Sequence, residues 1–127
     1  MRVVETGIEE LLAWLPTIRA AIPQKADLDE REVHERLAGR QYGVLRAGEG
    51  ITVWHEDRGA LYVWLSVSRE RRNGAMTACL DHLAATTRYE QWTAKTHRDN
   101  VAARSVFARY GLMPGRDVNG VLYLARQ

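Results

Sequence analysis

A short stretch with two arginines and a glycine contains residue types that bind an anionic group. It reads Arg71-Arg72-Asn73-Gly74-Ala75-Met76. It lies between an apolar run at 60–67 and a helical pattern, so Gly74 is expected at the start of a helix. The first N–H groups of a helix have no partner within it, and the helix dipole adds partial positive charge there. Because Gly74 has no Cβ, the backbone could approach a diphosphate closely.

The same stretch also has a purely structural interpretation. Gly74 could be only a turn residue, and Arg71, Arg72 and the nearby Arg69 could form a solvated rim. One glycine near several arginines does not choose between a phosphate site and a turn. The choice depends on the elements around the stretch and on a second pattern farther along the chain.

Hydrophobic periodicity predicts strands and helices around this stretch. Strands are expected at 2–5, 42–46, 51–55, 60–67, 91–96 and 121–124, with a further short strand near 116–118. Helices are expected from Ile8, with a kink or end at Pro16, then over 29–39, after Gly74, and over 100–110. Thr6 and Asp29 are expected N-caps, because a glutamate follows each of them three residues later.

The run at 60–67 is the strongest strand in this pattern. Apolar residues fill most of both alternating sets, Leu61, Val63, Leu65 and Val67 on one side and Tyr62, Trp64 and Ser66 on the other. Both faces of this strand are therefore expected to be covered, as in the centre of a sheet. The strand, helix and strand within 60–96 predict a parallel pair joined by a right-handed crossover.

A second pattern follows the strand at 91–96. Residues 100–112 read Asn-Val-Ala-Ala-Arg-Ser-Val-Phe-Ala-Arg-Tyr-Gly-Leu and resemble the GNAT acetyltransferase signature Asn-x-x-Ala-x-x-x-Tyr-x-x-x-Gly-Phe. Asn100, Ala103 and Gly111 match at the same spacing, whereas Phe107 and Leu112 are replacements. Arg71-x-x-Gly74 likewise resembles the Arg/Gln-x-x-Gly-x-Gly/Ala phosphate motif of that family. The resemblance covers roughly residues 60–112, and the N-terminal third fits by its element order alone.

The resemblance implies an α/β fold in a single domain over residues 1–127. The expected sheet is mixed and mostly antiparallel, with a central splayed parallel strand pair, and helices flank it. Acetyl-CoA is the implied cosubstrate, with no metal. Its pantetheine arm would lie along the main chain of the first strand of the pair, and its pyrophosphate at the turn that follows. The cofactor-binding residues implied in this way are Leu65, Ser66, Val67, Arg71, Arg72, Asn73, Gly74, Ala75, Met76, Asn100 and Phe107.

Three of these positions need comment. Asn100 would contact the pantetheine or cap the helix that follows it, and both roles use the same side-chain chemistry. Met76 stands where the family has glycine or alanine, so its side chain would crowd the phosphates. Phe107 stands where many members have a tyrosine that protonates the leaving thiolate, and it has no hydroxyl to donate. We therefore name no general acid.

The general base is left among a few candidates. Glu56 and His55, near the turn before 60–67, could reach an acceptor amine directly or through water. His97, at the end of the strand at 91–96, is a further candidate, and each of the three also fits an exposed rim position. Trp64 is the aromatic residue expected to contact the acceptor, although burial in the core is the default for a tryptophan.

The activity implied by the resemblance is transfer of an acetyl group from acetyl-CoA to a primary amine of a small molecule or a protein. The alternative is an acyl-CoA-binding or regulatory module with weak or no catalysis, which Phe107 and the lack of a carboxylate within 60–67 favour. Nucleic-acid modification ranks last, because a net charge of +2 is small and the basic residues at 88–109 fit a solvated helix face.

Composition is that of an ordinary folded protein. Apolar residues make up 46% of the 127 and charged residues 27%. The single cysteine, Cys79, excludes an intramolecular disulfide, and Cys79 with His82 lacks the other ligands that zinc needs. No apolar run approaches the ~20 residues of a membrane span, and no signal peptide is recognisable, so a cytoplasmic location is expected. A homodimer is left open.

Overall fold

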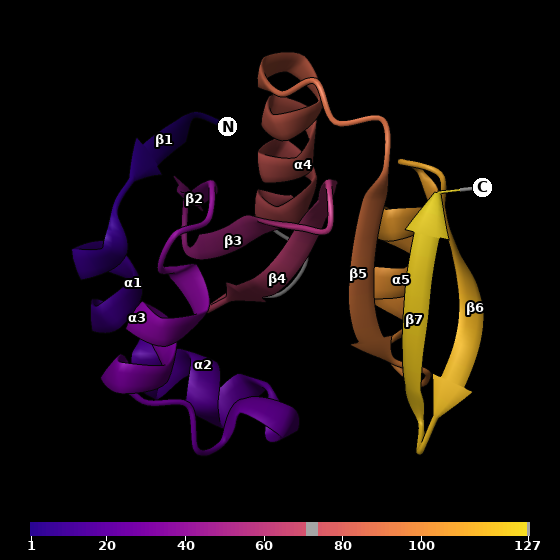
Figure 1. Cartoon of the computed structure of the whole chain (residues 1–127). Coiled ribbons are helices and arrows are strands. Elements are labelled where there is room, and N and C mark those ends of the chain that lie inside the picture. The colour runs from indigo at the N-terminus through magenta and orange to yellow at the C-terminus, as the bar shows by residue number, and fades with distance from the viewer. Residues whose placement is uncertain (71–73, 127) are drawn as a thin grey trace.

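The computed structural model describes residues 1–70 and 74–126, which form a seven-stranded sheet flanked by helices (Figure 1). The strands are β1 (Val3–Thr6), β2 (Tyr42–Ala47), β3 (Gly50–Asp57), β4 (Ala60–Ser68), β5 (Trp92–His97), β6 (Leu112–Val118) and β7 (Val121–Arg126). Their order across the sheet is β1-β2-β3-β4-β5-β7-β6. Strands β4 and β5 are parallel, and all other neighbours are antiparallel. The expected mixed sheet with a central parallel pair is confirmed.

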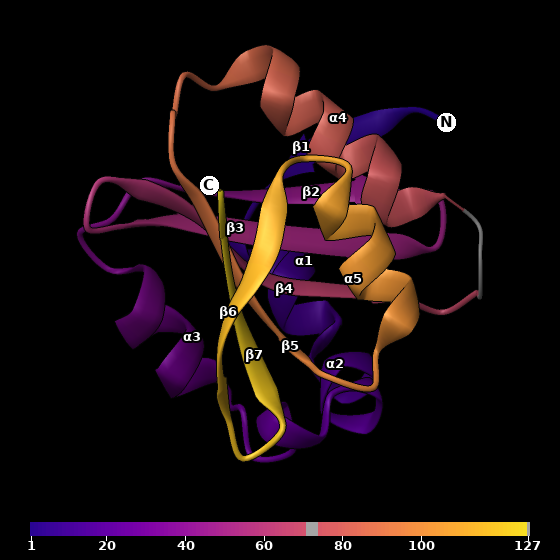
Figure 2. The ribbon, with the colours of Figure 1, turned by 90° about the vertical axis from the view of Figure 1, so that its right-hand side faces the viewer.

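Helices lie on both faces of this sheet (Figures 1 and 2). They are α1 (Ile8–Ala13), α2 (Leu15–Ala21), the short 3-10 helix η1 (Pro23–Lys25), α3 (Glu30–Leu37), α4 (Ala75–Thr86) and α5 (Val101–Ala108). Helices α4 and α5 share one face, whereas α1, α2 and α3 share the other. Within residues 1–70 and 74–126, no helix is both long enough and apolar enough to span a membrane.

Two groups of buried side chains hold these layers together, one on each face of the sheet. The group under α4 and α5 includes Leu61, Val63, Leu80, Trp92 and Phe107. The group under α1, α2 and α3 includes Leu11, Ile18, Val33, Val53, Tyr62 and Trp64. Strand β4 contributes to both groups, so the expectation that both of its faces are covered is confirmed.

Local signals at the N-terminal helices were correct at two positions and wrong at one. Pro16 lies in the first turn of α2, where its missing N–H costs no helical bond, and α1 ends before it at Ala13. The Asp29 carboxylate accepts a hydrogen bond from the Glu32 N–H at 2.8 Å and caps α3 as expected. Thr6 does not cap α1: it ends β1, its hydroxyl donates to the Val44 carbonyl, and Gly7 is the N-cap.

The C-terminal hairpin is longer than the sequence indicates. A short strand was expected near 116–118, whereas β6 runs from Leu112 to Val118. Pro114 and Gly115 disfavour a strand, and the register with β7 shifts between Pro114 and Asp117. Because β6 is an edge strand, the missing N–H of Pro114 is tolerated there.

The start of α4 packs closely against the first residue of β3. A Cβ atom added at Gly50 would lie 2.5 Å from the Cβ of Ala75 and 3.5 Å from the Val67 carbonyl oxygen. Gly50 itself pairs with Ser68 at the end of β4. The small residues at 50 and 75 therefore allow the helix to begin directly beside the end of β4.

We predict that Gly50→Ala lowers the free energy of unfolding by about 1–3 kcal/mol, because the new methyl group overlaps Ala75. Urea denaturation monitored by circular dichroism measures the change. The double variant Gly50→Ala/Ala75→Gly removes the facing Cβ and should recover part of the loss, with a coupling energy of about 0.5–3 kcal/mol. Strictly additive effects of the two substitutions would show that this contact does not limit the position of α4.

Candidate active site

Strands β4 and β5 pair over only the first part of their length. The paired positions are Leu61–Trp92, Tyr62–Thr93 and Val63–Ala94. Beyond them β4 continues to Ser68 along β3, and β5 continues to His97 along β7. In Figure 2, β3 and β4 cross the view while β5 and β7 descend steeply. We call residues 64–68 of β4 and 95–97 of β5 the splayed segments.

A β-bulge marks the point where β4 leaves β5. Val53 on β3 pairs with Leu65, but its neighbour Trp54 pairs with Val63, so Trp64 is the extra residue. Trp64 and Leu65 consequently both belong to the buried group under α1, α2 and α3. A bulge bends its strand and increases the local twist, which here helps to carry β4 away from β5.

The bulge also changes the direction of the main-chain groups along β4. Before the bulge, the N–H of Leu61 donates to the Gln91 carbonyl on the β5 side at 2.9 Å. After the bulge, the N–H of Arg69 donates to the Glu49 carbonyl on the β3 side at 2.8 Å. Main-chain N–H groups alternate in direction from one strand residue to the next, so those of Leu61 and Arg69, an even number of residues apart, would point to the same side in a regular strand. The extra residue has therefore reversed the alternation.

This reversal corrects part of the expected cofactor set. The main chain of Leu65 and Val67 was expected to face the pantetheine, but both residues share the orientation of Arg69 and face β3. The main-chain groups of Ser66 are the ones directed toward the β5 side. The Ser66 hydroxyl lies 3.0 Å from that of Thr52, so its side chain is held on the α4 face of the sheet.

Helix α4 begins at a glycine in the left-handed conformation. Gly74 is the N-cap with φ of 78°, which a residue with a Cβ adopts only with strain. Among the described residues, nothing lies within 4 Å of a Cβ added at this position. The first turn contains no acidic residue. The helix start can therefore accept an anionic group without charge repulsion from its own side chains.

The other residues expected at the phosphate turn have different surroundings. Arg71, Arg72 and Asn73 lie outside the described residues. Met76 is half-buried and packs against the core group under α4, so part of its side chain is turned toward the protein interior. Arg69 lies 3.6 Å from a Glu49 carboxylate oxygen, and its guanidinium stacks 3.9 Å from the centre of the Trp14 ring.

Asn100 is the N-cap of α5, and Phe107 lies within this helix. The side-chain oxygen of Asn100 accepts the Ala103 N–H at 3.1 Å, which is the capping role. Phe107 is buried in the core group under α4 and α5. The hydroxyl of Tyr110, one turn later, donates to the Thr77 carbonyl and to Asp81 on α4. Burial and the Asp81 carboxylate raise the pKa of Tyr110, so this phenol stays protonated and ties α5 to α4.

Known proteins resemble this chain in structure but not detectably in sequence. No protein-family model and no curated protein matches the chain. Solved structures do match over almost the whole length. An acetyltransferase from Thermus thermophilus has a TM-score of 0.70 at 13% identity, covering 99% of this chain and 97% of that one.

Two further structures match with similar quality. A GNAT family acetyltransferase from Elizabethkingia anophelis with acetyl-CoA bound has a TM-score of 0.67 at 13% identity, covering 99% of this chain and 97% of that one. An acyl-CoA N-acyltransferase from Pseudomonas aeruginosa has a TM-score of 0.67 at 14% identity and covers 100% of both chains. The chain has the GNAT fold. In this structure the start of α4 at Ala75 lies beside Gly50 and the end of β4, because a Cβ added at Gly50 would contact both Ala75 and the Val67 carbonyl oxygen.

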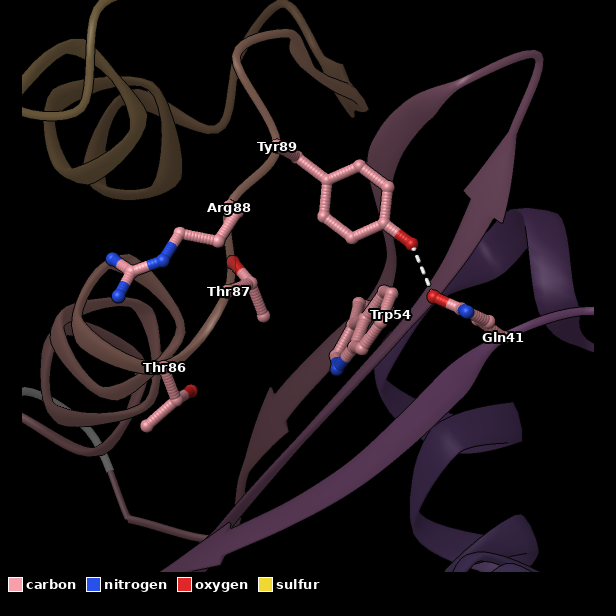
Figure 3. Close-up of a pocket in the computed structure, with 6 residues that line it drawn as sticks. All are labelled: Gln41, Trp54, Thr86, Thr87, Arg88 and Tyr89. Atoms are coloured by element: carbon pink, nitrogen blue, oxygen red, sulfur yellow. Dashed lines mark hydrogen bonds between the residues drawn. The ribbon is translucent and has the colours of Figure 1, made fainter.

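The GNAT fold places Glu56 away from the splayed segments. Glu56 pairs with Leu61 at the closed end of the β4–β5 pair. One of its carboxylate oxygens accepts the Tyr89 hydroxyl at 3.1 Å, and the same hydroxyl donates to Gln41 at 2.8 Å. In Figure 3, Tyr89 and Gln41 point toward each other beside Trp54. They line a pocket of about 340 Å³ with Thr86, Thr87 and Arg88. The structure thus does not bring Glu56 together with Gly74 and Ser66.

His97 lies at the splayed end of β5, but its ring nitrogens are poorly arranged for a base. Its Nδ1 accepts the Asp99 N–H at 3.2 Å. A neutral imidazole has one protonated nitrogen, so when Nδ1 accepts, Nε2 carries the proton and has no lone pair. The side chain is 43% exposed and lies 3.5 Å from an Asp99 carboxylate oxygen.

In His55 the other ring nitrogen carries the proton, in contrast to His97. It is fully buried, and its ring centre lies 5.2 Å from that of Tyr62 and 5.9 Å from that of Trp64. Its Nδ1 lies 3.0 Å from the Glu56 carbonyl oxygen. A carbonyl can only accept, so Nδ1 carries the proton and Nε2 has the lone pair. Within the described part of the chain, Nε2 has no hydrogen-bond partner.

The surroundings of His55 keep its ring neutral. Burial lowers the pKa of His55, and the nearby Arg36 and Arg40 guanidinium groups lower it further. The hydrogen bond to the Glu56 carbonyl and the Asp57 carboxylate act in the other direction but are outweighed. A neutral histidine with an available Nε2 can accept a proton near neutral pH. The sequence named His55 only as one of several candidates, because neither its burial nor its tautomer can be read from residue order.

Cys79 and His82 have separate surroundings and do not act as a ligand pair. Cys79 is fully buried in the core group under α4, and burial raises the pKa of its thiol. His82 instead pairs with Glu5, with 3.1 Å between Nε2 and the carboxylate oxygen. Among residues 1–70 and 74–126, no cluster of three or more His, Cys, Asp or Glu side chains is arranged to hold a metal ion.

We predict that His55 titrates below the ordinary histidine pKa of about 6.5. Two-dimensional NMR of ¹⁵N-labelled histidine side chains measures it, with the signal assigned from His55→Gln. The unfolded chain then binds more protons than the folded one between the folded pKa and about 6.5, so stability falls as pH decreases through that window. His55→Gln should weaken this pH dependence of urea unfolding. A His55 signal that protonates at or above 6.5 would contradict the assignment.

Proposed function

We propose that the chain is an acyl-CoA-dependent N-acyltransferase that transfers an acetyl group from acetyl-CoA to a primary amine. The observation that carries this proposal is the end of β4–β5 pairing at Val63 and Ala94, next to a helix that starts at a left-handed glycine. The Elizabethkingia anophelis structure of the same fold has acetyl-CoA bound, which supports the same cosubstrate here.

In this proposal the cofactor lies along the splayed segments. The main-chain groups of Ser66 would pair with the pantetheine amides, since they point toward the β5 side. The diphosphate would lie on the N–H groups at the start of α4, with Gly74 allowing the close approach. Arg71, Arg72 and Asn73 would complete this turn. Asn100 would use its amide nitrogen, since its oxygen is occupied by the Ala103 N–H.

The reaction joins the amine to the acetyl carbon and releases CoA. The acceptor nitrogen attacks the thioester carbonyl carbon, a C–N bond forms, and the C–S bond breaks after the tetrahedral intermediate. The thiolate leaves and takes up a proton as CoA thiol, while the nitrogen loses a proton to a base. Holding the two reactants in near-attack geometry can supply roughly 7–11 kcal/mol of the barrier reduction. A main-chain N–H of the splayed β4 segment that is not paired with the pantetheine would polarise the carbonyl.

His55 is the base that the geometry favours over Glu56 and His97. Its Nε2 has a lone pair, burial keeps the ring neutral, and the ring adjoins Trp64 at the start of the splayed segment. Glu56 accepts a hydrogen bond from Tyr89 at the closed end of the pair. The lone pair of His97 Nδ1 is occupied by a backbone N–H. No general acid is assigned, and water would protonate the thiolate.

One observation favours the alternative of a binding module without catalysis. Phe107 is 4% exposed and has no hydroxyl, so it cannot protonate a thiolate even though it occupies the position of the family tyrosine. A module would bind acetyl-CoA but would not consume it. Binding and turnover must therefore be measured separately.

We predict that Gly74→Asp weakens CoA binding by at least about tenfold relative to Gly74→Asn, measured by isothermal titration calorimetry. Asparagine and aspartate have nearly the same size, and both tolerate a positive φ, so the pair isolates the added negative charge beside the diphosphate. Equal CoA affinities of the two variants would argue against the phosphate site at α4. Unfolding curves of both variants control for a general loss of structure.

We further predict turnover of acetyl-CoA with at least one member of a primary-amine panel, measured by release of CoA thiol. His55→Gln should lower kcat by about 10²-fold or more, which is the usual contribution of a general base. His97→Gln is the matched control and should retain most activity. Tight CoA binding without turnover of any amine would instead support the module, and equal kcat values for the two variants would reject His55 as the base.

A further inference from the structure

Three cationic side chains converge on the aromatic residues beside the splayed segments. They come from separate elements: Lys25 from η1, Arg36 from α3 and Lys95 from β5. The Lys25 Nζ lies 5.8 Å from the Trp64 ring centre and the Arg36 Cζ lies 5.3 Å from it. The Lys95 Nζ lies 5.9 Å from the Tyr62 ring centre. We call Lys25, Arg36 and Lys95, with the rings of Tyr62 and Trp64, the cationic face.

The charges of this face are not balanced within the protein. In the part of the chain that the structure describes, none of Lys25, Arg36 and Lys95 has an acidic oxygen within 4.0 Å. Elsewhere arginines do have acidic neighbours, as in the pairs Arg31–Glu35, Arg40–Asp57, Arg46–Glu10, Arg69–Glu49 and Arg98–Asp117. Other described arginines also have no acidic oxygen within 4.0 Å, so the cationic face is distinguished by the convergence of three such cations and not by the lack of ion pairs alone.

The three cations also repel one another. Burial lowers the pKa of Lys25, and the positive charges of Arg36 and Lys95 lower it further, while Glu32 only partly opposes them. Each cation gains something from the ring beneath it, but a cation–π contact contributes only about 0.5–2 kcal/mol. Convergence of like charges is unfavourable in the protein alone and becomes favourable when an anion binds between them.

Two buried polar atoms beside the cations indicate that a ligand has both a hydrogen-bond acceptor and a hydrogen-bond donor. Trp64 is 7% exposed, and its indole Nε1–H has no acceptor among the described residues. His55 is fully buried, and its Nε2 has no donor among them. A buried polar group without a partner costs about 1–3 kcal/mol, so each is expected to have one in the functional complex. An anionic oxygen suits the indole N–H, and an amine N–H suits the imidazole.

These two atoms lie in neighbouring rings. The ring centres of His55 and Trp64 are 5.9 Å apart. Because the two rings are neighbours, a ligand that contacts both would carry its amine and its anionic group within one small molecule. A lysine side chain of a protein, with its amine far from any carboxylate of its own, does not have this form. A small amino acid does.

We propose that the acceptor is a small amino acid, whose carboxylate binds Lys25, Arg36 and Lys95 beside Trp64 and whose amine is directed to His55. This inference rests on the proposed acetyl transfer and names its substrate class. The products would be the N-acetylated amino acid and CoA thiol. Sequence reasoning missed the three cations because they are distant in the chain and belong to no motif; only the fold brings them together.

The activity test compares amines that differ only in charge. The wild-type protein is assayed with acetyl-CoA and β-alanine, β-alaninamide, propylamine, phosphoethanolamine and a lysine-containing peptide. We expect kcat/KM to be at least about tenfold higher for β-alanine than for its amide, because a hydrogen-bonded charge contributes roughly that factor. Arg36→Gln, Lys25→Gln and Lys95→Gln should each reduce this preference. Arg31→Gln, on the same helix α3 but paired with Glu35, is the control and should leave it unchanged.

A binding test stands apart from activity. The Trp64 indole ¹⁵N–¹H signal, assigned from Trp64→Phe, should shift on addition of β-alanine to the wild-type protein saturated with CoA, but not on addition of propylamine. The shift should be lost in Arg36→Gln. Equal rates for β-alanine, its amide and the peptide, or a preference for phosphoethanolamine, would overturn the amino-acid assignment. So would an unchanged Trp64 signal. Failure of CoA to bind in calorimetry would instead reject the proposed function itself.

Discussion

The separation of β4 from β5 is the constraint on which the rest of the site depends. Each parallel pairing that is lost removes main-chain hydrogen bonds worth a net ~0.5–1.5 kcal/mol apiece, so two adjacent parallel strands stay paired unless something holds them apart. Here β4 is anchored to β3 along its length and β5 to β7, and the bulge at Trp64 adds twist at the point of departure. The main-chain groups exposed by this separation are available to a ligand that has amides of its own.

The two faces of the sheet carry different parts of the candidate site. On one face, the small residues Gly50 and Ala75 let α4 start beside the end of β4. On the other face, the bulge turns Trp64 and Leu65 the same way and places Trp64 beside His55. A single extra residue in β4 thus sets both the main-chain direction at Ser66 and the position of the aromatic ring. In the proposed function, main-chain groups would bind the cofactor and side chains would bind the acceptor.

The sequence was sufficient for the architecture and for the start of α4, but not for the acceptor side. Alternation along 60–67 and the strand–helix–strand order gave the parallel pair, and the motif around Gly74 gave the helix start. The bulge has no signature in the sequence, because Trp64 and Leu65 are both compatible with regular alternation. The directions of the main-chain groups of Leu65 and Val67 were therefore predicted wrongly. Most of β6 was not predicted because of Pro114, since a proline disfavours a strand unless the strand is known to lie at the edge of a sheet. His55, Lys25, Arg36 and Lys95 come together only through long-range packing.

Arg36 connects the acceptor charge to the strength of the proposed base. Its guanidinium lowers the pKa of both Lys25 and His55, and it opposes the burial that raises the pKa of Tyr62 to about 12. In the protein without an acceptor, this charge helps to keep His55 neutral, which is the state that can take up a proton. A carboxylate bound between the cations would offset part of their field and raise the proton affinity of His55. A neutral amine would leave the field unchanged. The same interaction that binds an amino acid would therefore make His55 a better proton acceptor when that acceptor is in place.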